Sequence, residues 1–199
     1  MALGRALQEG TDPALGLGAL APISGPYDYS GTLRAALFGE INAAPQYLAY
    51  LIVAWNRLHH LYDAPSEAFQ APYDARVETL LDGDHTVEQV FAGISATTPE
   101  ELFTPRFLAG MQHPTGALQQ ALREADGSCD WLPQVPVELY AAGGDRDVPI
   151  ANAEHAQQVL RAHGADVRLI DAGDVDHVTS VVLSLPRVLE QFGEVGSKG

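Results

Sequence analysis

The amino-acid sequence predicts an α/β fold, a short parallel sheet interrupted by a large helical insertion. The last part of the chain alternates strand, helix, strand and helix patterns, which implies parallel strands joined by crossovers. Residues 32–127 carry only helical patterns. An apolar run before them, Leu15–Ala21, is expected to be a buried strand. We therefore expect an α/β core from residues 1–31 and 128–193, a helical insertion over 32–127, and a disordered tail over 194–199.

The first helical patterns show their own start and stop signals. Leu3, Ala6 and Leu7 share one helical face ahead of Gly10, so the chain is expected to begin inside a helix with no N-cap before it. In the insertion, PQYLAYLIVAWNRLHHLYD (45–63) begins with proline, the residue favoured in a first helical turn, and repeats apolar residues at helical spacing.

The C-terminal elements follow in order. VPVELYAAGGD (135–145) alternates as a strand and ends in a Gly-Gly turn. IANAEHAQQVLRAHG (150–164) is an amphipathic helix, in which we place His163 on the inner face, and ADVRLIDAG (165–173) is the next strand. SLPRVLEQF (184–192) is expected to be the closing helix, with Ser184 as its N-cap.

Composition excludes several classes of function. The chain has 199 residues and a formal net charge of −15, which argues against nucleic acid or an anionic membrane as a partner. Its single cysteine, Cys129, allows no intrachain disulfide. The best apolar run, Tyr47–Trp55, is too short for a membrane span. The N-terminus lacks the basic start and apolar block of a signal peptide, so the compartment stays open.

Two loops at the expected carboxyl edge of the sheet carry an acid and a histidine. Asp145 follows one strand and His177 follows the next, and chemistry in open α/β sheets sits at that edge. A carboxylate on one imidazole nitrogen would fix the tautomer and leave the other nitrogen free to accept a proton. Asp147 competes for the acid role, while Asp174 and Asp176 flank the histidine. A solvated acidic loop beside a structural histidine explains the same spacing.

The segment AAGGDRDVPIANAEHAQQVLRAHGADVRLIDAGDVDHVTSVVLSLPRVLEQF (141–192) resembles the C-terminal end of α/β-hydrolases, more narrowly the bacterial secreted esterase/lipase-like branch. LGALAPISGPYDYSG (17–31), YLAYLIVAWNRLHHLY (47–62) and CDWLPQVPVELY (129–140) resemble further segments of that family. The resemblance implies a partial α/β-hydrolase fold, a lid formed by the insertion, and carboxylic ester hydrolysis. Through its D-x-x-V-P turn it implies Asp145 as the orienting acid and His177 as the base.

The family's nucleophile elbow, G-x-S-x-G, is missing from the sequence. The resemblance places it just before Met1, so we expect a truncated chain that holds the acid and the histidine without the serine. Ser24, at a strand end on the same edge, is the possible replacement, although serines beside Gly-Pro are usually turn formers. Cys129 is considered as well, although a buried, unreactive cysteine is the more usual reading. Tyr27 and Asp28 are candidates for binding substrate.

Two hypotheses follow from these patterns. The chain is either an esterase or lipase-like hydrolase of a small-molecule ester, without cofactor or metal, or a non-catalytic frame that folds as a homo-oligomer. In the first case the nucleophile is unusual, comes from another chain, or is a water activated by His177. In the second, the exposed sheet edge or the lid helices would form the contact. His85 and Glu88 share one helix face, but two ligands do not make a metal site.

Overall fold

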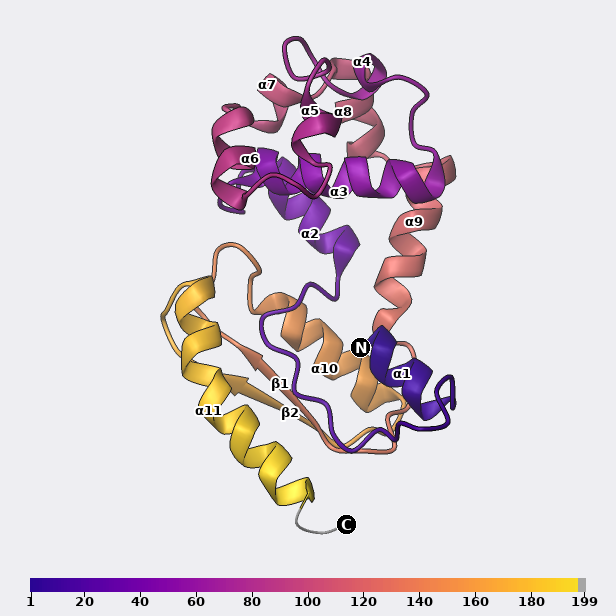
Figure 1. Ribbon diagram of the computed structural model, residues 1–199, viewed down its shortest axis with the longest axis vertical. Coiled ribbons are helices and arrows are strands. Elements are labelled where there is room, and N and C mark those ends of the chain that lie inside the picture. The colour runs from indigo at the N-terminus through magenta and orange to yellow at the C-terminus, as the bar shows by residue number, and fades with distance from the viewer. Residues whose placement is uncertain (197–199) are drawn as a thin grey trace. The chain divides into compact units, whose positions relative to one another are not determined.

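The computed structural model describes residues 1–196, with side chains up to residue 193, and divides into two compact units (Figure 1). The core unit consists of Met1–Tyr29 and Ala125–Gly199, and the helical unit of Ser30–Glu124. The fold class is α/β, with helices dominating and a short sheet of two parallel strands. No helix of the described residues is both long and apolar enough to cross a membrane.

The core unit holds the sheet. Its elements are α1 (Ala2–Gln8), a 3-10 turn η1 (Gly127–Cys129), β1 (Val137–Ala141), α10 (Ala151–Ala162), β2 (Val167–Asp171) and α11 (His177–Gly196). The strands are parallel, with Val137 opposite Val167 and Ala141 opposite Asp171. The two predicted strands and the helix between them are therefore confirmed.

The third expected strand, Leu15–Ala21, does not form as predicted. None of the residues of Leu15–Ala21 is buried, and contact with β1 begins only at Leu20, as isolated bridges. Leu20 and Ile23 each form an isolated parallel bridge to β1. Gly16 and Gly18 disfavour a strand. On the side that faces away from β1, residues 16–23 make no backbone hydrogen bond to a described residue. The prediction of a buried strand at Leu15–Ala21 was wrong, and the open edge explains its exposure.

Alternation along β1 builds two faces. Val137 and Leu139 join Ala156 and Leu160 of α10 in the buried core, and α10 packs on both strands. Tyr140, 1% exposed, points to the other face, where α11 packs against β1. Burial of a residue such as Leu139 or Leu160 contributes about 1.5–3 kcal/mol. His163, expected on the inner face of α10, is instead exposed at the end of the helix and bonds Asp130.

Helix α11 begins seven residues earlier than the sequence predicted. Asp176 supplies the cap, because its Oδ1 accepts a hydrogen bond from the Thr179 amide at 2.8 Å. Ser184 is not an N-cap; it is buried inside the helix and donates to the Ser180 carbonyl. The helix runs to Gly196, into the segment 194–199 predicted as a disordered tail, and the rest of that segment lies outside the described residues.

The helical unit contains helices and connecting loops, as its sequence pattern predicted. Its elements are α2 (Tyr29–Leu37), α3 (Ala44–His59), α4 (Pro65–Ala68), α5 (Val77–Leu80), α6 (Val87–Gly93), α7 (Pro99–Leu102), α8 (Pro105–Gln112) and α9 (Gly116–Asp126), the first and last of which cross its boundary. Phe69 and Phe103, both fully buried, lie with ring centroids 5.1 Å apart and anchor its core. Ile52 and Val53 of α3 are buried as well.

The helical unit is an insertion within the core unit. The chain leaves the core unit after Tyr29 and returns at Ala125. Both ends of the interruption are tied together, because the Tyr29 amide donates to Asp126 Oδ1 at 2.7 Å.

Candidate active site

The two loops that follow β1 and β2 approach each other closely at Gly144. A Cβ at this position would lie 2.6 Å from Asp174 Oδ1 and 2.7 Å from the Val175 amide nitrogen, so only glycine fits. The Gly144 amide also donates to the Gly173 carbonyl at 3.3 Å. Glycine at 144 therefore lets the loop that carries the acid meet the loop that leads to the histidine.

Asp171, the last residue of β2, joins the same two loops. Its Oδ1 accepts hydrogen bonds from the Gly143 amide at 3.0 Å and from the Gly173 amide at 2.8 Å. The sequence analysis did not single out Asp171. The signal was available, since an aspartate at a strand end beside a glycine often caps the following turn.

Asp145 is held by its own turn. Its Oδ1 accepts from the amides of Asp147 and Val148, both at 2.9 Å, and its side chain is fully buried. Asp145 Oδ2 lies 2.7 Å from His177 Nδ1. Three donors around one carboxyl group suit the ionised form, which only accepts hydrogen bonds. Of the acids considered from the sequence, Asp145 is the one that contacts the imidazole. Asp147 contributes only its backbone amide, which donates to Asp145.

His177 is the first residue of α11, and its two ring nitrogens differ. Nδ1 faces Asp145, which favours the tautomer that carries its proton on Nδ1. Nε2 makes no hydrogen bond to a described residue, and 31% of the side chain is exposed. The neighbouring Asp176 accepts the Thr179 amide, and this bond lowers the pKa of the Asp176 carboxyl. The arrangement leaves Nε2 available as a proton acceptor.

Ser24 belongs to a chain of buried hydroxyls beneath His177. Its Oγ lies 2.7 Å from Ser180 Oγ, and Ser180 Oγ donates to the His177 carbonyl at 2.7 Å. Because a hydroxyl has one hydrogen, Ser24 must be the donor to Ser180. Ser24 is 5% exposed and has a φ of 44°, an uncommon conformation for serine. The structure therefore places Ser24 under the start of α11, bonded to Ser180, which the sequence analysis missed.

Tyr27 and Asp28 are held through Asn152, a second residue that the sequence analysis missed. Both amides donate to the side-chain oxygen of Asn152 at 3.0 Å. Tyr27 is buried in the core cluster of the core unit, and burial, with a smaller effect of Cys129, raises the pKa of its phenol. Asp28 is half-buried. The loop that leaves the extended segment is thus fixed by the first turn of α10.

Neither the cysteine nor the histidine–glutamate pair builds a second site. Cys129 is fully buried, and burial raises the pKa of its thiol, which lowers its reactivity as a nucleophile. His85 bonds Asp82, at 3.0 Å. Among the described residues, no three histidine, cysteine or acidic side chains gather in a way that could hold a metal ion.

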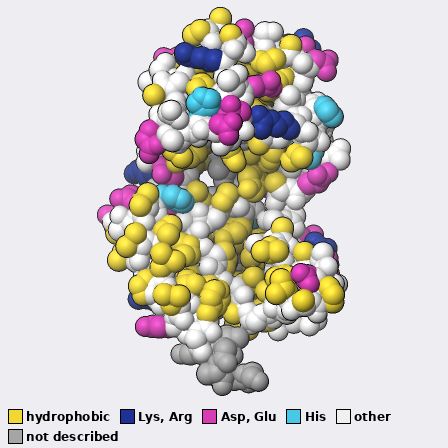
Figure 2. Space-filling view, in the orientation of Figure 1, with side chains coloured by type: hydrophobic (Ala, Val, Ile, Leu, Met, Phe, Trp, Pro, Cys, Tyr) yellow, Lys and Arg dark blue, Asp and Glu magenta, His cyan; other side chains and the backbone are white. Residues whose placement is uncertain are grey.

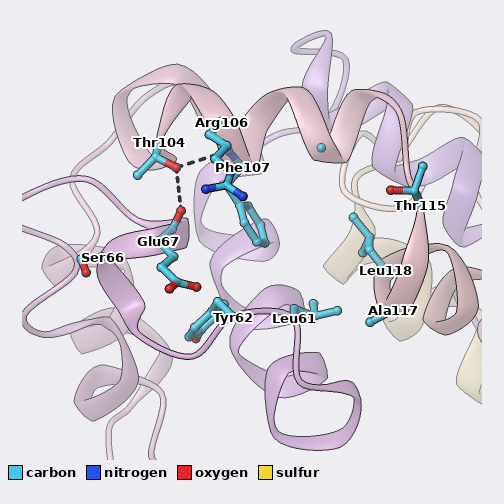
Figure 3. Close-up of a pocket in the computed structure, with 11 residues that line it drawn as sticks. Leu61, Tyr62, Ser66, Glu67, Thr104, Arg106, Phe107, Thr115, Ala117 and Leu118 are labelled. Carbon is cyan, nitrogen blue, oxygen red and sulfur yellow. Dashed lines mark hydrogen bonds between the residues drawn. The ribbon is translucent and has the colours of Figure 1, made fainter.

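The helical unit has cavities of its own. One of about 600 Å³ is drawn in Figure 3, with Glu67, Arg106, Phe107 and Tyr62 around it. Thr104 shapes one end, because its hydroxyl donates to the Glu67 carbonyl and accepts from the Phe107 amide. A second cavity, of about 820 Å³, has mostly apolar walls: Leu33, Leu37, Phe38, Met111 and Leu122. These volumes are in the range of small-molecule sites.

Solved hydrolase structures share this fold. A protein from Legionella pneumophila subsp. pneumophila str. Philadelphia 1, assigned as a hydrolase, matches 97% of the chain with a TM-score of 0.86 and 27% identity, and the match covers 52% of that protein. The rice cell wall degrading esterase LipA from Xanthomonas oryzae matches 90% of the chain, with a TM-score of 0.77 and 27% identity, over 50% of its own length.

The chain thus spans about half the length of the solved structures it matches. No protein-family model and no curated protein matches it. The likeness shows a hydrolase-type α/β fold.

Proposed function

We propose that this chain supplies the acid–base pair of a carboxylic ester hydrolase, with His177 as the base and Asp145 as the residue that orients it. The observation that carries the proposal is the 2.7 Å contact between Asp145 Oδ2 and His177 Nδ1, on an imidazole whose side chain is 31% exposed. Asp145 follows β1 and His177 follows β2. This placement at two successive strand ends is the one that the resemblance to α/β-hydrolases implies. The esterase among the solved structures supports the same reaction class.

The reaction would proceed by acyl transfer. His177 Nε2 takes the proton of an attacking hydroxyl, whose oxygen bonds to the ester carbonyl carbon. The imidazolium that results is stabilised by Asp145 and then gives its proton to the departing alkoxide as the tetrahedral intermediate collapses. Asp145 keeps its place throughout, because its Oδ1 remains bonded to two backbone amides.

The attacking hydroxyl has three candidate sources. Ser24 already gives its hydrogen to Ser180, so its attack would require that buried bond to break first. A water molecule bound at the partly exposed imidazole is the second source. A serine on another polypeptide is the third. The hydrogen bonding of Ser24 therefore favours water or an external serine, and without an oxyanion hole of known position we expect slow turnover.

We assign the helical unit the role of the lid that the resemblance to α/β-hydrolases implies, with an apolar cavity of its own. Its cavity of about 820 Å³ supports this role, because the apolar walls suit an acyl chain or an aryl group. Leu33 and Leu122, both buried, would form the floor of such a site.

Hydrolysis of a short-chain p-nitrophenyl ester tests the proposal. We expect activity in the purified chain that falls at least about tenfold in His177→Gln, since general base catalysis contributes roughly 100-fold or more. His163→Gln is the matched control, because His163 is bound to Asp130 in a solvent-exposed pair at 2.6 Å and has no place in the mechanism. Equal activity in both variants would disprove the role of His177.

A fluorophosphonate probe with intact-mass analysis separates the sources of the nucleophile. A single adduct on Ser24, lost in Ser24→Ala, would identify a serine of this chain. Activity that needs His177 without any adduct would indicate water.

The second candidate is a non-catalytic protein that functions as a homo-oligomer. The open edge of the extended segment at Leu20–Ser24 favours it, because unpaired strand edges pair readily with other chains. Absence of hydrolysis by a folded, oligomeric protein would support this alternative over the first.

A further inference from the structure

Helix α11 carries an apolar stripe that the rest of the protein leaves uncovered. Figure 2 shows hydrophobic side chains gathered over this helix. The stripe consists of Val178, Val182, Leu185, Leu189 and Phe192, which are 69%, 61%, 48%, 71% and 46% exposed. The opposite side of α11 packs into the core unit through Ser180, Ser184 and Val188, all buried. The helix therefore has two apolar or small-residue faces, and only one of them has a partner among the described residues.

The spacing of the stripe is that of a helix–helix seam. Its residues follow one another at intervals of four, three, four and three, the a/d repeat of helices that pack in pairs. No other described helix exposes five large apolar side chains at this spacing. A face of this kind fits a helix with the same repeat, and the chain carries such a helix in α11 itself.

The charge of α11 also favours contact with an identical chain. Residues 177–193 carry one basic and one acidic side chain, Arg187 and Glu190, besides His177. The whole chain carries a net charge of −15. Two copies would repel each other over most of their surfaces, and this helix is a face on which they can meet without that repulsion.

We propose that α11 is the contact surface of a homodimer, in which the stripe of one copy packs against the stripe of a second. A twofold contact needs a self-complementary surface, and a single apolar seam satisfies that requirement. The pairing places Leu185, the central residue of the stripe, beside its counterpart in either a parallel or an antiparallel arrangement. This inference does not depend on the proposed hydrolase activity, and it assigns the contact to α11 rather than to the sheet edge or the helical unit.

Sedimentation velocity between about 1 and about 100 μM protein tests the proposal. We expect the wild-type chain to dimerise and Leu189→Glu to weaken the dimer at least about tenfold, since a charge would enter the seam. The matched control is Leu58→Glu on α3, which makes the same change at a residue of similar exposure, 73% against 71%. Both substitutions are on exposed positions, so circular dichroism should show intact helices in each.

Disulfide cross-linking checks the geometry by a separate readout. Leu185→Cys should form a covalent dimer on mild oxidation, whereas Arg187→Cys, outside the stripe on the same helix, should not. The native Cys129 is fully buried and should give little background.

Three outcomes would overturn the proposal. The first is a wild-type chain that stays monomeric over the whole concentration range. The second is self-association that Leu58→Glu weakens as much as Leu189→Glu does. The third is self-association that neither variant weakens, which would direct attention to the sheet edge at Leu20–Ser24. Because no substrate enters either measurement, loss of hydrolysis and loss of dimerisation remain separate results.

Discussion

Gly144→Ala should destabilise the core unit and separate the proposed catalytic pair. The new Cβ would lie 2.6 Å from Asp174 Oδ1 and 2.7 Å from a backbone amide nitrogen, whereas ordinary contacts begin at 3.4 Å. The two loops would have to move apart by roughly 0.8 Å, the difference between 3.4 and 2.6 Å. The bond from the Gly144 amide to the Gly173 carbonyl, already 3.3 Å long, would be lost. Overpacking and the lost bond together predict a decrease of about 2–3 kcal/mol in the free energy of unfolding.

The neighbouring glycine provides the control. A Cβ at Gly143 would meet its nearest atom, Asp171 Oδ2, at 3.7 Å, so Gly143→Ala should change the free energy of unfolding by less than about 0.5 kcal/mol. Urea titrations followed by Trp131, in a Trp55→Phe background, report on the core unit, because Trp131 is buried there. Equal stability of the two alanine variants would refute the close approach of the loops at Gly144.

Three further predictions concern the same unit. Asp145→Asn should reduce any ester hydrolysis that depends on His177 by at least about tenfold, measured as kcat, because the amide favours the wrong imidazole tautomer. Ser180→Ala should lower the free energy of unfolding by about 1–3 kcal/mol in urea titrations, because it leaves the buried Ser24 hydroxyl without its acceptor. Burial, aided by Glu138, which accepts its hydroxyl hydrogen, raises the pKa of Tyr140 from 10.0 to about 12. The unfolded chain then loses this proton first, so stability should fall as the pH rises from 10.0 to about 12, and this part of the fall should vanish in Tyr140→Phe.

Local patterns were enough to predict the sheet and its connection. The alternation of Val137, Leu139 and Ala141 and the amphipathic pattern of α10 depend on residues close together in sequence, and both elements lie where they were expected. The start of α11 was missed although its cap is local, because Asp176 was considered only as an acid beside His177. A distant contact also holds this end of the helix. Ser180 bonds both the His177 carbonyl and Ser24, which lies 156 residues earlier in the chain.

Strand order predicted that an acid would meet His177, the resemblance to α/β-hydrolases singled out Asp145, and the structure brings these two side chains together. It was harder to choose among the four aspartates near His177. The choice depends on the conformation of the turn that holds Asp145, which directs its carboxylate toward the imidazole. The surroundings of Ser24 could not be inferred from sequence, since its burial requires α11 to pack over it. The exposed stripe on α11 was hidden for a similar reason, because an apolar helix pattern does not tell which of two faces the sheet will cover.

The hydrogen bond between the Tyr29 amide and Asp126 implies that the helical unit can be removed and replaced by a short linker. Because the points of exit and return are already neighbours in the core unit, a short linker in place of residues 30–124 would close a small loop at little entropic cost. The same geometry allows the inserted unit to be lengthened, shortened or exchanged without disturbing the order of the strands. A change confined to this segment would leave the strand ends that hold Asp145 and His177 in place.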